Sequence, residues 1–170
     1  MTNDQETRGL PWTAGRSSVD YRIMGGVSRS SWQATSDDAA IFSGAVSLES
    51  GGGFCSVRSP ERDWGLGHNH GIEFQVRGDG KTYKVSVRTS RLEDGESYQF
   101  RFHTEPNTLV SLSVPWSDFI LTFRGRAVPN PTVLNSAAIR TIGFLVGERQ
   151  EGAFQLSISS LRGLNAPNCL

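Results

Sequence analysis

Cysteine is scarce in this chain, which has only Cys55 and Cys169 among its 170 residues. One of the two lies in a strand-like segment and the other at the extreme end, so a disulfide framework is excluded and a reducing compartment is favoured. A chain of this length can bury a substantial core without disulfide or metal support.

An excess of charge of either sign is also missing. The 17 basic residues cancel the 17 acidic ones. General binders of nucleic acid or anionic membranes rely on summed positive charge, so this balance argues against both classes and predicts no nucleic-acid partner. It leaves room for a local basic patch.

Long apolar runs are absent as well, and no stretch approaches the roughly 20 residues that a membrane-spanning helix needs. The opening MTNDQETRGL is polar and acidic, unlike a secretory signal or an Arg-rich transit peptide. We therefore expect a protein that does not span the membrane. Its expected location is the cytoplasm, or an organelle interior if a presequence has been removed.

Helical periodicity is rare, and apolar residues instead recur at every second position from residue 42 onward. Such alternation is typical of strands with one buried face. It is seen at Phe42, Val46, Leu48; Ile72, Phe74, Val76; Tyr83, Val85, Val87; Tyr98, Phe100, Phe102; Val110, Leu112, Val114; Ile142, Phe144, Val146; and Phe154, Leu156, Ile158. These strands predict an all-β sandwich or jelly roll in a single domain over 12–163. Residues 1–11 form a flexible segment and residues 164–170 a tail in this prediction.

Motifs for catalysis or cofactor binding are missing. The segment RGDGK lies between two strand patterns and lacks the spacing of a phosphate-binding loop, so we predict a hairpin there. SGGGF is followed by no helix pattern, and no Gly-x-Ser-x-Gly elbow occurs. We expect no cofactor and no enzymatic activity, and an unrecognised hydrolase ranks last among the hypotheses.

Histidine and tryptophan each leave an alternative open. His68 and His70 have the His-x-His spacing of a metal site that His103 could complete, against a pair of solvated loop histidines. The four tryptophans, Trp12, Trp32, Trp64 and Trp116, fall outside the alternating runs. They either pack under loops or stack on a sugar or a partner.

Five blocks of the sequence together resemble one family. In chain order they are MGGVS, FSGAVSLESGGGFCSVR, GIEFQVRGDGKTYKVSVRT, VPWSDFILTFRGR and IRTIGFLVGERQEGAFQLSISSL. Over residues 12–163 they look like the thirty-kilodalton complex I intermediate-associated protein family. The resemblance implies a galactose-binding-like β-sandwich. It also implies relationship to mitochondrial chaperones that help to assemble NADH:ubiquinone oxidoreductase. The compact chain favours a stand-alone, bacterial-type member.

A binding role follows as the main hypothesis. We expect a non-enzymatic assembly or chaperone-type factor that holds a protein partner, such as a subunit of a respiratory or photosynthetic membrane complex. The alternative is a carbohydrate-binding module of the same fold, with a glycan as the ligand. The candidate binding residues are Met24, Gly25, Gly26, Ser28, Gly51, Gly52, Gly53, Phe54, Arg58, Arg77 and Asp79. The run around Met24 either receives the partner or forms a tight bend.

Overall fold

Strands dominate the computed structural model, which describes residues 22–24, 29–36, 38–49 and 53–165. Two short 3₁₀ turns, Trp116–Asp118 and Ser136–Ala138, lie in connections between strands. The strands are β1 (Arg22–Met24), β2 (Arg29–Ser36), β3 (Ala39–Val46), β4 (Cys55–Arg58), β5 (Gly71–Arg77), β6 (Thr82–Thr89), β7 (Glu96–His103), β8 (Leu109–Pro115), β9 (Ile120–Phe123), β10 (Arg126–Ala127), β11 (Ile139–Val146) and β12 (Gly152–Leu164).

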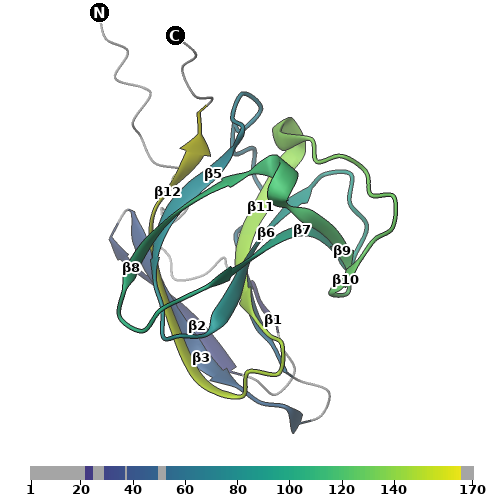
Figure 1. The fold of residues 1–170 in the computed structure, drawn as a ribbon. Helices are drawn as coiled ribbons and strands as arrows, with labels where there is room; N and C mark the ends of the chain where they lie inside the picture. The colour runs from purple at the N-terminus through teal and green to yellow at the C-terminus, as the bar shows by residue number, and fades with distance from the viewer. Residues whose placement is uncertain (1–21, 25–28, 37, 50–52, 166–170) are drawn as a thin grey trace, which may run out of the picture.

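The strands form two antiparallel sheets packed face to face (Figure 1). Sheet A has the order β1-β4-β11-β6-β7-β9-β10, and sheet B has the order β2-β3-β12-β5-β8. The predicted all-β sandwich is confirmed.

The core lies between the sheets and contains most of the alternating side chains that the sequence singles out, together with others such as Trp64, Leu66 and Leu161. Phe42, Val85 and Leu156 are fully buried. Aromatic rings join the two layers: Phe144 of β11 lies edge-on to Phe74 of β5, with 5.8 Å between ring centroids. Each strand therefore keeps one side for the core and one for the surface.

The prediction of a hairpin at RGDGK is wrong. β5 belongs to sheet B and β6 to sheet A, so residues 78–81 cross from one layer to the other. The physical cause is the pairing of each strand with other partners: β5 lies between β12 and β8, and β6 lies between β11 and β7. Gly78 lets this crossover pack closely on the β7–β8 connection, because an added Cβ there would lie 2.4 Å from the Cβ of Thr104.

Two strands precede the first alternating run and were not predicted. β1 pairs with β4, and β2 pairs with β3 along most of its length. The sequence of β2, RSSWQATS, carries one large apolar residue, Trp32, and this gives no alternating signal. Trp32 thus lies within a strand, where it stacks on Phe144 at 6.4 Å.

No helix among the described residues is long and apolar enough to cross a membrane.

Candidate functional site

One end of the sandwich gathers the connections that pass between the two sheets. β3, β5, β7 and β11 end there, and β4, β6, β8 and β12 begin there, as the strand pairing requires (Figure 1, lower end). We call this region the loop end; it comprises the described residues of 47–54, 78–81, 104–108 and 147–151. Loops carried on a rigid sandwich are common positions for binding residues.

The structure brings part of the predicted site to the loop end. Met24 is the last residue of β1, and Gly53, Phe54 and Asp79 lie in loop-end connections. The Phe54 side chain is 41% exposed. The other glycine-rich positions, Gly25, Gly26, Ser28, Gly51 and Gly52, fall outside the described residues.

The two predicted arginines do not converge. Arg58 ends β4 and points away from the core of sheet A, because its neighbour Val57 is buried. Arg77 ends β5 on the outer side of sheet B and is exposed. They therefore lie on opposite faces of the sandwich and cannot share one carboxylate.

Asp79 uses both of its carboxylate oxygens within the chain. Oδ1 accepts hydrogen bonds from the Tyr83 hydroxyl at 2.9 Å and the Lys81 amide at 3.1 Å, and Oδ2 accepts from the Gln155 amide at 3.0 Å. Burial alone would raise the pKa of Asp79, but these hydrogen bonds and the nearby Lys81 charge lower it below its ordinary value. Burial and the bond to Asp79 raise the pKa of Tyr83 far above its ordinary value. The carboxylate holds the β5–β6 connection to β12.

Two uncharged side chains lock the neighbouring connections. Gln150 accepts from the Thr82 amide at 2.9 Å and donates to the carbonyls of Thr82 and Gly147. Thr104 donates to the Lys81 carbonyl at 2.7 Å and accepts from the Gly80 amide. Because these bonds link three separate connections, this half of the loop end is pre-organised.

The turn between β11 and β12 is strained. Glu148 and Arg149 have φ values of 58° and 56°, a left-handed conformation that non-glycine residues rarely adopt. Glu148 lies 2.8 Å from Nε of Arg101 in an ion pair. The sequence does not indicate this left-handed conformation, because left-handed two-residue turns are recognised by Asn-Gly or Asp-Gly, whereas this one contains Glu and Arg.

The outer face of sheet A is basic. Arg58, Lys84, Arg88 and Arg101 occupy outward positions, and the register places Lys84 directly opposite Arg101. Two small residues separate Arg58 from the other three: Gly143 of β11 is paired with Arg58 on one side and with Ser86 of β6 on the other. No outward strand position of the described sheet carries Asp or Glu. This one-signed face is the local basic patch that the overall charge balance leaves possible.

The outer face of sheet B has a different composition. Serine, threonine and glutamine occupy most of its outward positions, and several bond to one another, as in Ser31 with Ser43 at 3.2 Å and Gln75 with Ser111 at 3.4 Å. Glu73 forms an ion pair with Arg162 on this face. This face is therefore mostly polar, and its exposed Arg77 makes no ion pair with a described residue.

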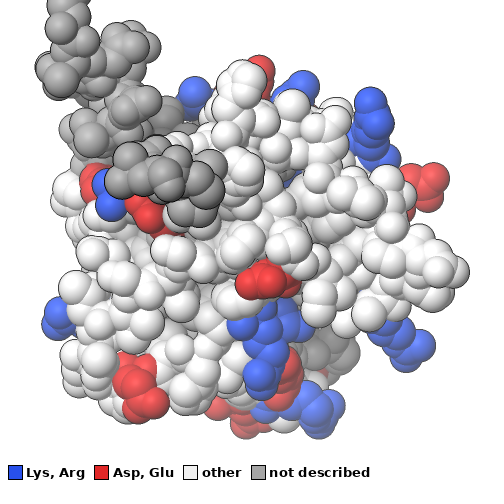
Figure 2. Space-filling model, turned by 45° about the horizontal axis from the view of Figure 1, so that its top comes forward, with Lys and Arg blue, Asp and Glu red and all other residues white. Residues whose placement is uncertain are grey.

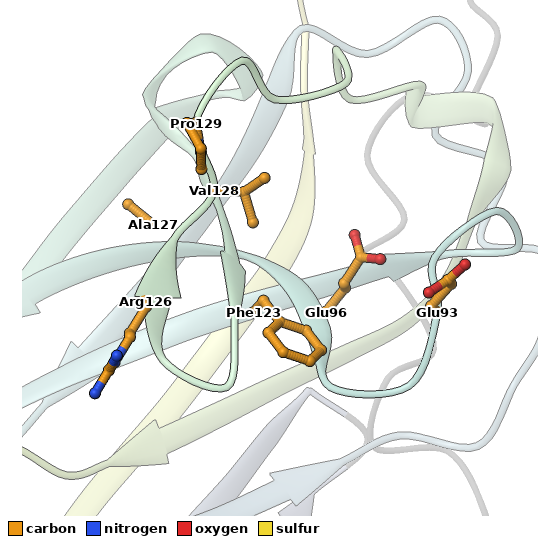
Figure 3. Close-up of a pocket in the computed structure, with 7 residues that line it drawn as sticks. All are labelled: Glu93, Glu96, Phe123, Arg126, Ala127, Val128 and Pro129. Carbon is orange, nitrogen blue, oxygen red and sulfur yellow. The ribbon is translucent and has the colours of Figure 1, made fainter.

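A hollow of about 410 Å³ lies at the other edge of sheet A, beside β9 and β10. Its walls are Glu93, Glu96, Phe123, Arg126, Ala127, Val128 and Pro129 (Figure 3). Phe123 is 44% exposed and is covered in part by the Arg124 guanidinium, 5.2 Å from the ring centroid. In Figure 3, Arg126 extends away from the two glutamates. The hollow thus offers no convergent set of polar groups.

The metal alternative finds no support among the described residues. They contain no group of three or more His, Cys, Asp or Glu side chains placed to hold an ion. His68 and His70 lie in the loop before β5, whereas His103 lies at the end of β7, where Nδ1 is 3.1 Å from the Thr82 hydroxyl. The three histidines therefore do not meet.

The described tryptophans are turned inward. The indole N–H of Trp64 donates to the Arg140 carbonyl at 3.0 Å, and that of Trp116 donates to the Asn69 carbonyl at 2.8 Å. Trp32 packs against the core. Trp12 lies outside the described residues. No outward strand position of the described sheets carries Trp or Tyr, so neither outer face presents an aromatic platform for a sugar.

The two antiparallel sheets form a galactose-binding-like β-sandwich. Two solved structures from Clostridium thermocellum share it at 14% identity. The family 11 carbohydrate-binding module in complex with a β-1,3-1,4-mixed-linked tetrasaccharide has a TM-score of 0.65, over 86% of this chain and 89% of that one. The family 11 module of the cellulosomal cellulase Lic26A-Cel5E has a TM-score of 0.66, over 95% and 97%. At this identity the likeness concerns the fold alone.

Sequence comparison supplies the family. Residues 12–158 match the model of Complex I intermediate-associated protein 30 (CIA30), and the chain belongs to this family. It is 25% identical over 143 residues to the mitochondrial Complex I intermediate-associated protein 30 of Neurospora crassa, covering 74% of this chain and 51% of that protein. It is 27% identical over 168 residues to an uncharacterised protein of Schizosaccharomyces pombe, covering 86% and 76%. The chain thus spans about half the length of the Neurospora protein.

Proposed function

We propose that this protein is a non-enzymatic assembly factor that holds a protein partner during the construction of a multi-subunit membrane complex. The observation that carries the proposal is the family match over residues 12–158. The protein acts in the compartment where that complex is assembled, the cytoplasm or an organelle interior.

The loop end is the part of the molecule that suits this role. Its Gln150, Thr104 and Asp79 hydrogen bonds keep the connections in place before binding. Exposed Phe54 and Leu109, at 41% and 52%, provide apolar contact area beside these connections. A pre-organised site with exposed apolar anchors favours protein binding, because little ordering cost is added on association.

Co-purification from the organism that encodes the protein tests the proposal. The tagged chain should recover subunits of one membrane complex, identified by mass spectrometry, and deletion should reduce the assembled complex on native gels. Phe54→Asp should lower recovery about tenfold, since a charge replaces an apolar anchor.

Val133→Asp is the matched control, because Val133 is 88% exposed and lies away from the loop end. It should leave recovery unchanged, and both variants should melt at similar temperatures. Normal levels of every membrane complex after deletion, together with binding of a mixed-linked glucan oligosaccharide, would replace this proposal with glycan binding.

A further inference from the structure

The outward strand positions of sheet A carry basic residues and no acid, although the total charge of the protein is zero, and Glu148, which is ion-paired with Arg101, comes from the β11–β12 turn. Over the side of the molecule shown in Figure 2, residues of both signs are interspersed and much of the surface is uncharged. Arg58, Lys84, Arg88 and Arg101, by contrast, share one sheet face without an outward acid. Like charges directly opposite one another, as at Lys84 and Arg101, are destabilising in a sheet.

Small residues lie among the basic side chains of this face. Gly143 has no side chain, and a Cβ there would lie 2.4 Å from the Val57 carbonyl oxygen, so the position admits no larger residue without a shift. Ser86 is its neighbour on β6. From strand spacing, the four basic Cα atoms fall within roughly 16 Å of one another, the length of about five extended residues.

Part of this charge is available for an external partner. Lys84 makes no ion pair with any described residue. Arg88 donates to the Glu93 carbonyl through Nη2 at 3.0 Å, which leaves its other N–H groups to bind elsewhere. Arg101 is paired with Glu148 of the strained turn, so the basic face continues into the loop end.

We propose that the outer face of sheet A binds an acidic segment of the partner protein, with Lys84 and Arg88 as its principal contacts. This inference rests on the proposed function for the protein nature of the partner. Charge complementarity specifies the chemistry, and continuity with the loop end allows one partner to contact both surfaces.

Nucleic acid is the less suitable anionic occupant. Single strands bind to basic grooves that also offer aromatic rings for the bases. The outward strand positions of the described sheet carry no aromatic residue. The neutral whole-molecule charge supplies no long-range attraction for a polyanion.

Fluorescence anisotropy with a labelled ten-residue peptide containing six Glu, and a matched peptide with Gln at those positions, tests the proposal on the full chain. At about 50 mM NaCl, where screening is weak, the Glu peptide should bind at least about tenfold more tightly than the Gln peptide. The double variant Lys84→Glu, Arg88→Glu should weaken Glu-peptide binding at least about tenfold.

Arg77→Glu, Arg126→Glu is the control with the same charge change, because both residues are exposed and Arg77 lies on the other sheet. It should alter affinity by less than about twofold. An equal loss in this control, or unchanged binding by the Lys84, Arg88 variant, would overturn the proposal. Tighter binding of a ten-nucleotide single-stranded RNA or of phosphatidylserine vesicles, abolished in the Lys84, Arg88 variant, would also overturn it.

The two proposals fail separately. If the Lys84, Arg88 variant still recovers membrane-complex subunits as well as the native chain, the acidic-segment site is wrong and the assembly role remains. If no such subunit is recovered by the native chain while the Glu peptide binds, the assembly role fails instead.

Discussion

The two outer faces of the sandwich are built by the same strand alternation and yet differ in chemistry. Sheet A displays Arg58, Lys84, Arg88 and Arg101, whereas sheet B displays serines, threonines and glutamines that bond among themselves. Their inner sides are alike, since both contribute apolar residues to one core. The fold therefore requires only the inner pattern, and it leaves the composition of the two outer faces free to differ.

The shared interior should give the largest effect of any single change. Phe144 is 2% exposed and contacts Phe74 and Trp32 of sheet B, so Phe144→Ala removes a ring that joins the layers. We expect it to lower the free energy of unfolding by about 3 to 5 kcal/mol, measured by urea denaturation. Binding of the Glu peptide by the folded fraction should persist.

The exposed ring of Phe54 provides the comparison for that experiment. Phe54→Ala should cost less than about 1 kcal/mol because its side chain is 41% exposed. Similar costs for the two truncations would show that the sheets are not held by a common core.

Asp79 joins the two layers at the loop end and should give the next largest effect. Asp79→Ala leaves the Gln155 and Lys81 amides without their acceptor and leaves the Tyr83 hydroxyl only the longer bond to the Gln155 carbonyl at 3.3 Å. We expect a loss of about 2 kcal/mol at pH 7, measured by urea denaturation.

The loss should depend on pH. The folded pKa of Asp79 lies below its unfolded value of about 3.9, so the ionised carboxylate stabilises the fold above that pH. This stability disappears as pH falls through the folded pKa. The difference between native protein and Asp79→Ala should therefore narrow below about pH 4. A difference that stays constant down to pH 2 would contradict the role assigned to the charge, and Asp118→Ala, an exposed acid away from this network, should show no such pattern.

Sequence alone predicted most of the sandwich, because alternating apolar residues such as Ile72, Phe74 and Val76 indicate seven of the strands. It could not predict β2, whose inward Trp32 is flanked by small polar residues. Nor could it tell a hairpin from a crossover at RGDGK, since the same turn residues serve both, and the choice depends on which distant strands pair with β5 and β6.

The candidate site also has a part that the sequence predicted and a part that it did not. Glycine-rich loops directed attention to the loop end, and Phe54 and Asp79 lie there. Lys84, Arg88 and Arg101 were not singled out, because Arg101 is distant in the sequence from the other two and lies opposite Lys84 only through the β6–β7 register. Alternation indicates which residues point outward, but neighbouring residues on a face are known only when the strand order is known.

A substitution at Glu148 should give the smallest of the predicted effects, a change in the affinity of the basic face for the acidic peptide. Its carboxylate forms an ion pair with Arg101 from the strained turn. Glu148→Gln should therefore leave the Arg101 guanidinium free to bind the acidic peptide. We expect Glu-peptide affinity to rise about twofold to threefold by anisotropy. The melting temperature should change little, because exposed ion pairs contribute little to stability.

Glu151→Gln removes the same charge from the same turn without breaking an ion pair of the described residues. If release of Arg101 is the cause, Glu151→Gln should raise affinity less than Glu148→Gln does. An equal rise in the two variants would mean that the peptide senses only the summed charge near the loop end. Arg101 would then make no direct contact with the acidic segment, and the site would contract to Lys84 and Arg88.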